Sequence, residues 1–313
     1  QSRCDAEGTG MTLSVLIPSS VVREAEDKRE ATRKLGYIAR SATVFRVDHL
    51  IVFPDRGGER RLGGEFVETV LRYAATPPHL RKKIWGRRDE LEYVGVLPPL
   101  RVSSTTGSES TDSGSLTQGI VTEVGPDDRV RVNCELQHPV SLHVPESVSV
   151  REGTRVAIRI SSREPVRARI VDTPLSGFDV SCLDLVDALE HAAAGITVAT
   201  SRHGDTVTTG RLPELAARVN RAGATIAFGA PGRGLPVILG DDNAPDSQTQ
   251  TDEKTVSPAN VDTTGDNTAS EVVEPNIDPG FDLWLNTIPQ QGSEVVRTEE
   301  AMFASLALLT ITE

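Results

Sequence analysis

The chain has 313 residues, enough for one large or two moderate domains, and no apolar run reaches the ~20 residues that a membrane-spanning helix needs. Its formal net charge of −12 argues at first sight against a nucleic-acid partner, but residues 241–278 hold ten Asp or Glu and a single Lys, which leaves −3 for the rest. This stretch lacks apolar periodicity, so we expect a disordered acidic insertion at 241–278. Residues 1–10 also show no pattern, and we expect them to be disordered.

Cysteine and lysine usage indicate the compartment and the solvent. Cys4, Cys134 and Cys182 form neither an even set nor a CxxC pair, which favours a soluble protein in a reducing cytoplasm. Cys134, His138 and His143 lack a fourth ligand, so no metal site is expected. Only five of the 33 basic residues are Lys, a composition typical of salt-loving microbes. At molar salt the Debye length is about 3 Å, so an acidic surface does not prevent contact with nucleic acid.

The N-terminal segment reads as one strand, helix, strand unit. Apolar runs predict strands at Leu13–Ile17 and His49–Phe53, with a helix that begins after Ser19 or Ser20. Arg40 lies off the apolar face of this helix and is predicted to be free to meet an anion, although most such arginines are only solvated. The apolar face consists of Leu35, Ile38, Ala42 and Phe45.

A basic cluster surrounds Trp85, shortly after Pro77 and Pro78. Basic residues that flank an aromatic ring suit RNA better than a generic surface, although a lone Trp is more often a core anchor. The candidates for RNA contact in this cluster are Arg81, Lys82, Lys83 and Arg87.

The middle of the chain predicts an all-β module at 116–172, between a Ser- and Gly-rich linker at 101–115 and a boundary near Asp172–Pro174. Four or five short strands of this size suit a small OB-like barrel, which is a common platform for oligonucleotides. The predicted strands are Gly119–Val124, Arg129–Cys134, Val140–Val144 and Arg155–Ile160. Arginines along them could follow a phosphate backbone or could pair with nearby acids, and we take Arg129, Arg131 and Arg159 as RNA-binding candidates. The predicted strands carry no Phe, Tyr or Trp, so contacts to the RNA backbone are favoured over base stacking.

The last third holds three strand-end loops. Residues 195–204 are a β-rich run that ends in a polar turn, with a predicted strand end near residue 200, and residues 224–228 predict a strand that is followed by glycines with GxxGxG spacing. That spacing is neither a dinucleotide fingerprint nor a phosphate loop, but glycines let backbone approach a nucleotide-like ligand closely. Ligands in open α/β sheets bind beyond the carboxyl ends of strands, so the three loops could converge on one crevice.

The third of these loops, 286–297, runs into a C-terminal helix. Thr298 is the predicted N-cap, and Glu299 and Glu300 suit the positive end of the helix dipole. Its predicted buried face consists of Ala301, Met302, Leu306 and Leu309. Elsewhere the sequence lacks a nucleophilic triad: Ser201, His203 and Asp205 alternate along the chain, and there is no GxSxG elbow.

Three segments carry a resemblance to the SPOUT superfamily of knotted RNA methyltransferases. Residues Gly36–Val47, with Arg40, are similar to the first motif of that superfamily, Phe228–Leu235 resembles the second, and Ile288–Ala301 resembles the third. Asp282–Pro289 resembles more specifically the archaeal and eukaryotic branch that has an inserted OB-fold domain, as does Val296–Ala301. The resemblance spans about residues 11–310. Several relatives carry Glu in the second motif where Ala230 or Pro231 stands here, so no acidic residue receives a role there.

The resemblance implies a fold that composition does not reveal. It implies a discontinuous α/β domain at 11–100 and 173–313, built on a SPOUT-type sheet whose C-terminal segment forms a trefoil knot, a rare exception to the rule against knots. The OB-like barrel is inserted into this domain. The usual assembly is a homodimer with the substrate site at the interface, and S-adenosylmethionine binds among the three loops.

The resemblance further implies an S-adenosylmethionine-dependent methyltransferase that acts on ribosomal RNA, with N3 of uridine as a possible target. Two alternatives remain: a ribosome-assembly module that binds RNA and keeps the pocket without turnover, and a methyltransferase that acts on protein. Arg40, Arg297 and Glu300 are the candidates for contacts to the target. The implied cofactor-binding residues are Thr200, Ser201, Phe228, Gly229, Gly234, Leu235, Ile288, Gln291, Gly292, Val296, Thr298 and Ala301.

Overall fold

The computed structural model describes residues 12–311, except 101–114, 241–279 and short gaps at 127–128, 135, 137, 146–147, 149, 174, 176 and 192–194. The expected tail at 1–10 and the expected acidic insertion at 241–278 lie outside the described residues, as does the expected linker apart from Ser115. In the described part of the chain, no helix combines the length and the apolarity needed to cross a membrane.

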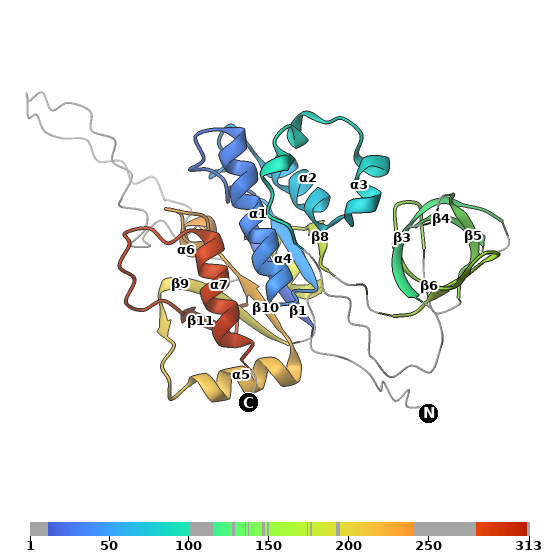
Figure 1. Cartoon of the computed structure of the whole chain (residues 1–313). Helices are drawn as coiled ribbons and strands as arrows, with labels where there is room; N and C mark the ends of the chain where they lie inside the picture. Colours follow the sequence, from blue (N-terminus) through green and yellow to red (C-terminus); the bar gives the residue numbers. More distant parts are fainter. Residues whose placement is uncertain are drawn as a thin grey trace, which may run out of the picture.

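A six-stranded parallel sheet forms the larger part of the molecule, with the strand order β11-β9-β10-β1-β2-β8 (Figure 1). The strands are β1 (Leu13–Pro18), β2 (His49–Phe53), β8 (Asp179–Cys182), β9 (Ile196–Thr206), β10 (Ala224–Ala227) and β11 (Leu283–Asn286). The predicted strands at 13–17, 49–53 and 224–228 are therefore confirmed, to within one residue at their ends. Their apolar runs reflect burial on both faces of the sheet, as is usual for parallel strands.

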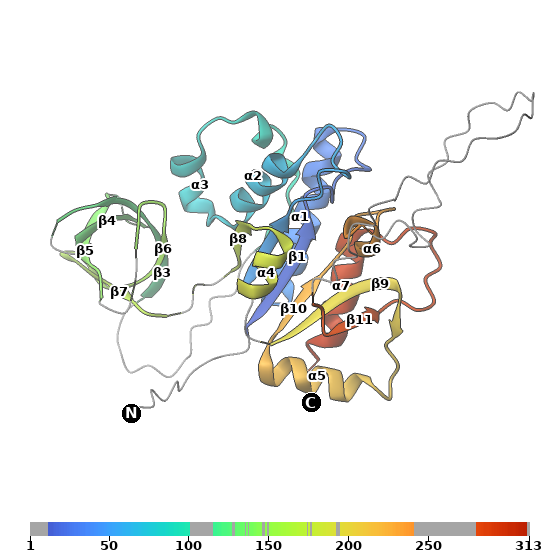
Figure 2. The same ribbon diagram turned by 180° about the vertical axis from the view of Figure 1, so that it is seen from behind.

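Helices cover both faces of this sheet (Figures 1 and 2). One face carries α1 (Lys28–Val44), α2 (Gly64–Ala75), α5 (Leu212–Ala222) and α7 (Thr298–Leu309), which share a core with Val15 and Ile17 of β1. The other face carries α4 (Leu185–His191) and α6 (Leu235–Ile238), which pack on Leu16 of the same strand. Further along the chain from α2 lie α3 (Pro78–Trp85) and two short 3-10 turns, η1 (Asp89–Leu91) and η2 (Val94–Val96).

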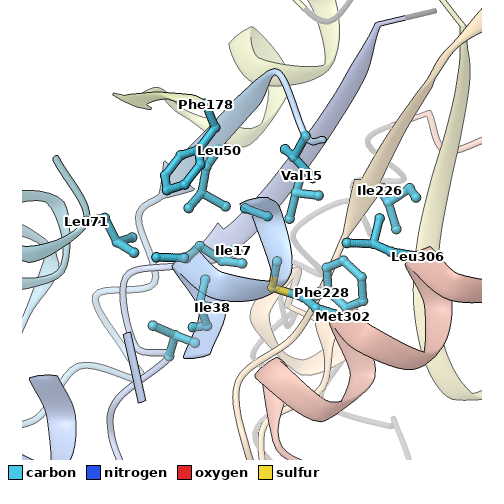
Figure 3. Packing of buried hydrophobic residues seen from close by; sticks show 14 of the residues in the cluster. Val15, Ile17, Ile38, Leu50, Leu71, Phe178, Ile226, Phe228, Met302 and Leu306 are labelled. Carbon is cyan, nitrogen blue, oxygen red and sulfur yellow. The ribbon is translucent and has the colours of Figure 1, made fainter. Parts of the chain in front are cut away.

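The core on the α1 and α7 side confirms most of the predicted helix faces (Figure 3). Leu35, Ile38 and Ala42 are fully buried, and Phe45 packs against the cluster from its edge. Met302, Leu306 and Leu309 of α7 are also fully buried, whereas Ala301 is only half-buried.

The first helix begins later than predicted. It starts at Lys28, where the carboxylate of Asp27 accepts the backbone N–H of Glu30 at 2.7 Å as an N-cap. Ser19 and Ser20, the predicted starting points, instead hold the loop after β2. Ser19 Oγ accepts the N–H of Asp55 at 2.8 Å, and Ser20 Oγ donates to the Asp55 carboxylate. Both hydroxyls therefore stabilise a contact between two strand ends, and the residues between them and Asp27 form turns.

The strand end predicted near residue 200 is also wrong. Strand β9 continues to Thr206, but its pairing with β11 shifts register: Trp284 lies opposite Ala199, and the next residue, Leu285, lies opposite Asp205. A β-irregularity of this kind re-aims the residues within it. Gly204 suits this position because a Cβ there would lie 2.8 Å from backbone atoms of Leu285.

The inserted module is a separate, nearly closed antiparallel sheet with the order β5-β4-β3-β6-β7, and β5 lies beside β7 (Figures 1 and 2). Its strands are β3 (Ser115–Val124), β4 (Arg129–Asn133), β5 (Val140–His143), β6 (Arg155–Arg163) and β7 (Val166–Val171). The four predicted strands are present, and β7 completes the sheet. Arg155 of β6 joins this module to the main sheet. Its Nη2 donates to the carbonyl of Phe178 at 3.1 Å and forms an ion pair with Asp179.

Candidate functional site

A cavity of about 360 Å³ opens where the three predicted loops meet, at the carboxyl ends of β10 and β11 and beside the register shift in the pairing of β9 with β11. The described residues that line it come from 200–202 within β9, from 228–234 after β10, and from 285–301, which runs from the end of β11 into α7. Its size falls within the usual range for small-molecule sites. The three loops, separated by up to about a hundred residues in the chain, therefore enclose one space.

Ten of the twelve predicted cofactor-binding residues line this cavity: Thr200, Ser201, Phe228, Gly229, Gly234, Ile288, Gln291, Val296, Thr298 and Ala301. Leu235 does not, because it is buried in the first turn of α6. Gly292 does not line it either, and an added Cβ there would meet no atom within 4 Å. The cavity also includes Arg202 and Arg233, which sequence reasoning did not select.

Short hydrogen bonds hold the three loops against one another. Thr298 Oγ1 donates to the carbonyl of Gly229 at 2.8 Å, which ties the start of α7 to the glycine loop. Thr200 Oγ1 donates to the carbonyl of Ala227 at 2.8 Å, and Asn286 Nδ2 donates to the carbonyl of Arg202 at 2.7 Å. Rigidly held backbone of this kind is the form in which strand-end loops present groups to a ligand.

We expect Thr298→Val to lower the free energy of unfolding by about 1 kcal/mol, because it removes the donor that the buried Thr298 side chain gives to the Gly229 carbonyl. Denaturant unfolding at constant salt measures the change. Thr298→Ser keeps the hydroxyl and is the matched control. Equal stability of Thr298→Val and wild type would mean that the contact between the two loops contributes nothing to the fold.

The glycine loop is packed too closely to accept a side chain at Gly229. An added Cβ there would lie 3.0 Å from the carbonyl O of Arg233, from Gly234 Cα and from the N of Leu235. All three neighbours are backbone atoms, so the loop itself would have to move. The loop closes on itself through paired backbone hydrogen bonds of 2.9 Å between Ala230 and Arg233.

Arg233 is fixed by a buried carboxylate. Its Nε lies 3.1 and 3.2 Å from the two carboxylate oxygens of Asp55, whose side chain is 3% exposed. Asp55 follows β2, and Arg233 follows β10, 178 residues later. The sequence signal that could have found Asp55 is its position two residues after the apolar run that predicts the strand at 49–53.

The three predicted target-contacting residues lie outside the cavity lining. The prediction that Arg40 is free needs correction: its Nη1 donates to the carbonyls of Leu100 at 2.9 Å and Pro99 at 3.3 Å. Glu300 accepts the backbone N–H of Arg297 at 2.9 Å. Arg297 is therefore the N-cap position of α7 in place of the predicted Thr298, whose hydroxyl is used by Gly229. The Arg297 side chain lies 3.6 Å from the carboxylate of Glu24.

The basic cluster around Trp85 has two kinds of members. Arg81 donates to the carbonyls of Ala74 and Thr76, both at 2.9 Å, and burial lowers its pKa. Trp85 donates from Nε1 to Thr76 Oγ1 at 3.0 Å, so it packs as an anchor. Lys82 and Arg87 are exposed, and the side chain of Lys83 lies outside the described part of the structure.

The barrel arginines also differ in their surroundings. Arg129 and Arg131 of β4 are exposed, and Arg131 lies 3.8 Å from the carboxylate of Glu123. Arg159 of β6 is half-buried beside a second cavity between β5 and β7, and its Nε has no hydrogen-bond partner among the described residues. Cys134 is buried in the barrel core. Within the described ranges, no three His, Cys, Asp or Glu side chains gather in a way that could hold a metal ion.

Comparison with known proteins adds independent findings. The model of a family described as "Putative RNA methyltransferase" matches residues 12–309. A protein of Haloarcula marismortui is 61% identical over 304 residues, which are 97% of this chain and 100% of the relative. A protein of Halobacterium salinarum is 58% identical over 303 residues, with 97% and 100% coverage. A 28S rRNA (uridine-N(3))-methyltransferase of Homo sapiens is 28% identical over 336 residues, with 96% of this chain and 78% of the relative covered.

Proposed function

Because the chain belongs to the RNA methyltransferase family whose model matches residues 12–309, we propose that this enzyme methylates N3 of a uridine in ribosomal RNA with S-adenosylmethionine as methyl donor. The target atom is suggested by the similarity to the human 28S rRNA (uridine-N(3))-methyltransferase, which covers 96% of the chain. The single observation that carries the proposal is the cavity enclosed by the three loops, two of which contain the second and third motifs of the resemblance.

The residues present fit the proposed cofactor. Leu285, Ile288 and Val296 offer an apolar wall for a purine ring, and Thr200 and Ser201 offer hydroxyls. At Gly229 the backbone is closely packed without a side chain, so main-chain groups can contact the ligand directly. When bound, S-adenosylmethionine supplies a methyl group that is already reactive. The protein therefore has to align the nucleophile and remove the proton of N3.

We propose a homodimer in which α1 contributes to the interface. Tyr37 and Val44 on α1 are each 46% exposed, and Val295 in the third loop is 42% exposed, which are high values for large apolar side chains. Arg40 lies between Tyr37 and Val44 on the same helical face, since residues at i, i+3 and i+7 align. In such a dimer Arg40 would contact the target, which remains a prediction, as do the roles of Arg297 and Glu300.

The finer structural predictions belong to the same proposal. We infer that the inserted module is an OB-fold, supported by the sheet order β5-β4-β3-β6-β7 with β5 next to β7, and that it helps to hold RNA. We also propose that the C-terminal segment is knotted, as the resemblance implies. The scarcity of Lys and the relatives from two halophilic archaea support a salt-rich, reducing cytoplasm as the working environment.

Two measurements test the proposed function. Calorimetry should detect S-adenosylmethionine binding to the wild-type protein at high salt. Labelled S-adenosylmethionine should then transfer its methyl group to ribosomal RNA that lacks the modification, and nuclease digestion should release 3-methyluridine. Binding without transfer would favour an assembly module that keeps the pocket, and label in protein but not in RNA would favour a protein methyltransferase. Absence of binding would contradict the assignment of the cavity.

A further inference from the structure

A group of arginines surrounds one buried carboxylate beside the cavity. Arg233 of the cavity wall is bonded to Asp55, and Arg23 lies close enough to Arg60, Arg233 and Asp55 to interact with all three. We refer to Arg23, Arg60, Arg233 and Asp55 as the arginine cluster. It has three positive charges and one negative charge. The cluster therefore holds a surplus of positive charge directly beside the proposed cofactor site.

The one carboxylate in the arginine cluster is already saturated. Asp55 accepts from Ser20 Oγ, from the N–H of Gly58 at 3.2 Å and from Arg233 Nε at 3.1 and 3.2 Å. The whole Asp55 residue is 4% exposed. Its carboxylate neutralises Arg233, and with these bonds made it has little hydrogen-bonding capacity left for Arg23. The role of Asp55 is to hold Arg233 at the cavity wall.

Two acids of the described residues that are sequence neighbours of these arginines, Glu24 and Glu59, have other partners. The carboxylate of Glu24 pairs with Lys34 and lies 3.6 Å from Arg297 Nε. Glu59 accepts the backbone N–H of Gly64 at 3.3 Å. Two further arginines of the loop after β2, Arg56 and Arg61, are exposed and add positive charge to the same side of the molecule.

Arg23 is the member of the arginine cluster that has a buried donor without an acceptor. Its Nε is buried and has no hydrogen-bond partner among the residues that the structure describes. Burial lowers the pKa of Arg23, repulsion from Arg60 and Arg233 lowers it further, and attraction to Asp55 opposes these effects. A buried guanidinium donor without an acceptor is costly, and an anion that reached it would relieve both the missing bond and the repulsion.

The position of the arginine cluster indicates which anion could arrive. Ser20 follows β1, Asp55 follows β2 and Arg233 follows β10, so the cluster lies along the same edge of the sheet as the cavity, on the β1 and β2 side. An RNA whose base enters the cavity must place its backbone at the rim. Guanidinium groups are well suited to phosphate because they can donate two parallel hydrogen bonds.

We propose that Arg23, together with Arg60, binds a backbone phosphate of the RNA next to the methylated nucleotide. This inference rests on the proposed function and names a substrate-binding subsite for it. Arg23 is a substrate-binding residue here, and Asp55 is a positioning residue that acts through Arg233.

Arg23→Gln tests the proposal because glutamine keeps much of the length of the side chain and removes the charge. We expect the affinity for unmodified ribosomal RNA to fall about tenfold, and the slope of log affinity against log KCl concentration to become shallower by about 1. S-adenosylmethionine affinity should stay at the wild-type value. The melting temperature should stay the same or rise, because the substitution removes a poorly compensated charge. Arg23→Gln/Arg60→Gln should lower RNA affinity further.

Arg221→Gln is the matched control. Arg221 is exposed in the last turn of α5, which leads into β10 and so lies at the opposite edge of the sheet from the cavity. The Arg221→Gln substitution removes the same charge from the protein as Arg23→Gln does. Long-range electrostatics alone would therefore lower the RNA affinity of both variants equally. An equal loss of RNA affinity in Arg221→Gln and Arg23→Gln would overturn the subsite.

A double-mutant cycle that combines Arg23→Gln with modified RNA identifies the phosphate that Arg23 contacts. In a short RNA that contains the methylated uridine, one flanking phosphate at a time is replaced by an uncharged methylphosphonate. One such replacement should weaken binding to the wild type but not to Arg23→Gln, since the two changes remove the same contact. Additive losses at every position would refute the contact. If Arg23→Gln binds RNA with the affinity and the salt slope of the wild type, this inference is overturned. The proposed function still stands in that case, provided that the wild-type enzyme transfers methyl groups to RNA. Failure of the wild type to methylate RNA would count against both.

Discussion

Gly229→Val should lower the affinity for S-adenosylmethionine by at least a factor of about 100, which corresponds to roughly 2.7 kcal/mol of binding free energy. The added carbons would collide with backbone atoms of Arg233, Gly234 and Leu235 that lie 3.0 Å from the ideal Cβ position. Since the colliding atoms are backbone and no side chain there can move aside, the glycine loop must change its own conformation. That change also strains the hydrogen bond from Thr298 to the Gly229 carbonyl. Isothermal calorimetry at fixed salt gives the affinity.

Gly210→Val is the control for this prediction, because a Cβ at Gly210 would meet no atom within 4 Å and the residue precedes α5, outside the cavity lining. Both variants must keep a cooperative thermal transition. Gly292 provides a contrast: the space around it is open, so a substitution there reduces affinity only if the bound ligand itself comes close. Normal S-adenosylmethionine binding by Gly229→Val would place the cofactor somewhere other than this cavity.

Arg40→Ala should reduce methyl transfer by more than tenfold and leave S-adenosylmethionine affinity nearly unchanged. The proposed role of Arg40 is contact with the target, and a lost target contact lowers turnover without changing cofactor binding. Its Nη1 is occupied by the carbonyls of Pro99 and Leu100, and the same guanidinium carries further donors. Arg40→Lys should restore activity only in part, because an ammonium lacks the planar fork. Single-turnover assays with labelled cofactor measure the effect.

Two further readouts separate a target contact from a structural role. Light scattering establishes whether Arg40→Ala keeps the assembly state of the wild type, because Arg40 lies between the exposed Tyr37 and Val44. Thermal unfolding reports the loss of the hydrogen bonds to residues 99 and 100, which we expect to cost about 1 kcal/mol. Full transfer activity in Arg40→Ala would make this residue an anchor for the segment before the barrel and nothing more.

Prediction from sequence worked best where one face of an element is buried. The apolar runs of β1, β2 and β10 and the spacing of Leu35, Ile38 and Ala42 follow directly from the periods of strand and helix. It worked less well at element ends. The start of α1 and the N-cap of α7 were both misplaced, because Ser20 and Thr298 give their hydroxyls to partners far along the chain instead of to the adjacent helix.

For the candidate site, too, the sequence predicted the segments that take part but not the polar contacts between them. Glycine spacing and the resemblance pointed to the loop at 228–235 and to the loop before α7, and the loops at 200–202, 228–234 and 285–301 enclose the cavity. Neither could reveal the pair of Asp55 and Arg233, because 178 residues separate them and each looks like an ordinary loop residue in its own segment. The same holds for Arg81, whose guanidinium is used by the carbonyls at the end of α2.

What the amino-acid sequence determined by itself is therefore the set of strands and helical faces, the division into a parallel α/β part and a β module, and the family. Local periodicity and composition decide the strands, the helical faces and the division, since burying one face requires only that apolar residues recur at the right interval. The family follows instead from the resemblance of three segments. What only the tertiary structure decided is which polar groups meet: Arg23 with Arg60 and Arg233, Asp55 with Ser20, Thr298 with Gly229. The strand order of the sheet determines those partners, because a buried polar group bonds to whatever the packed fold brings within reach.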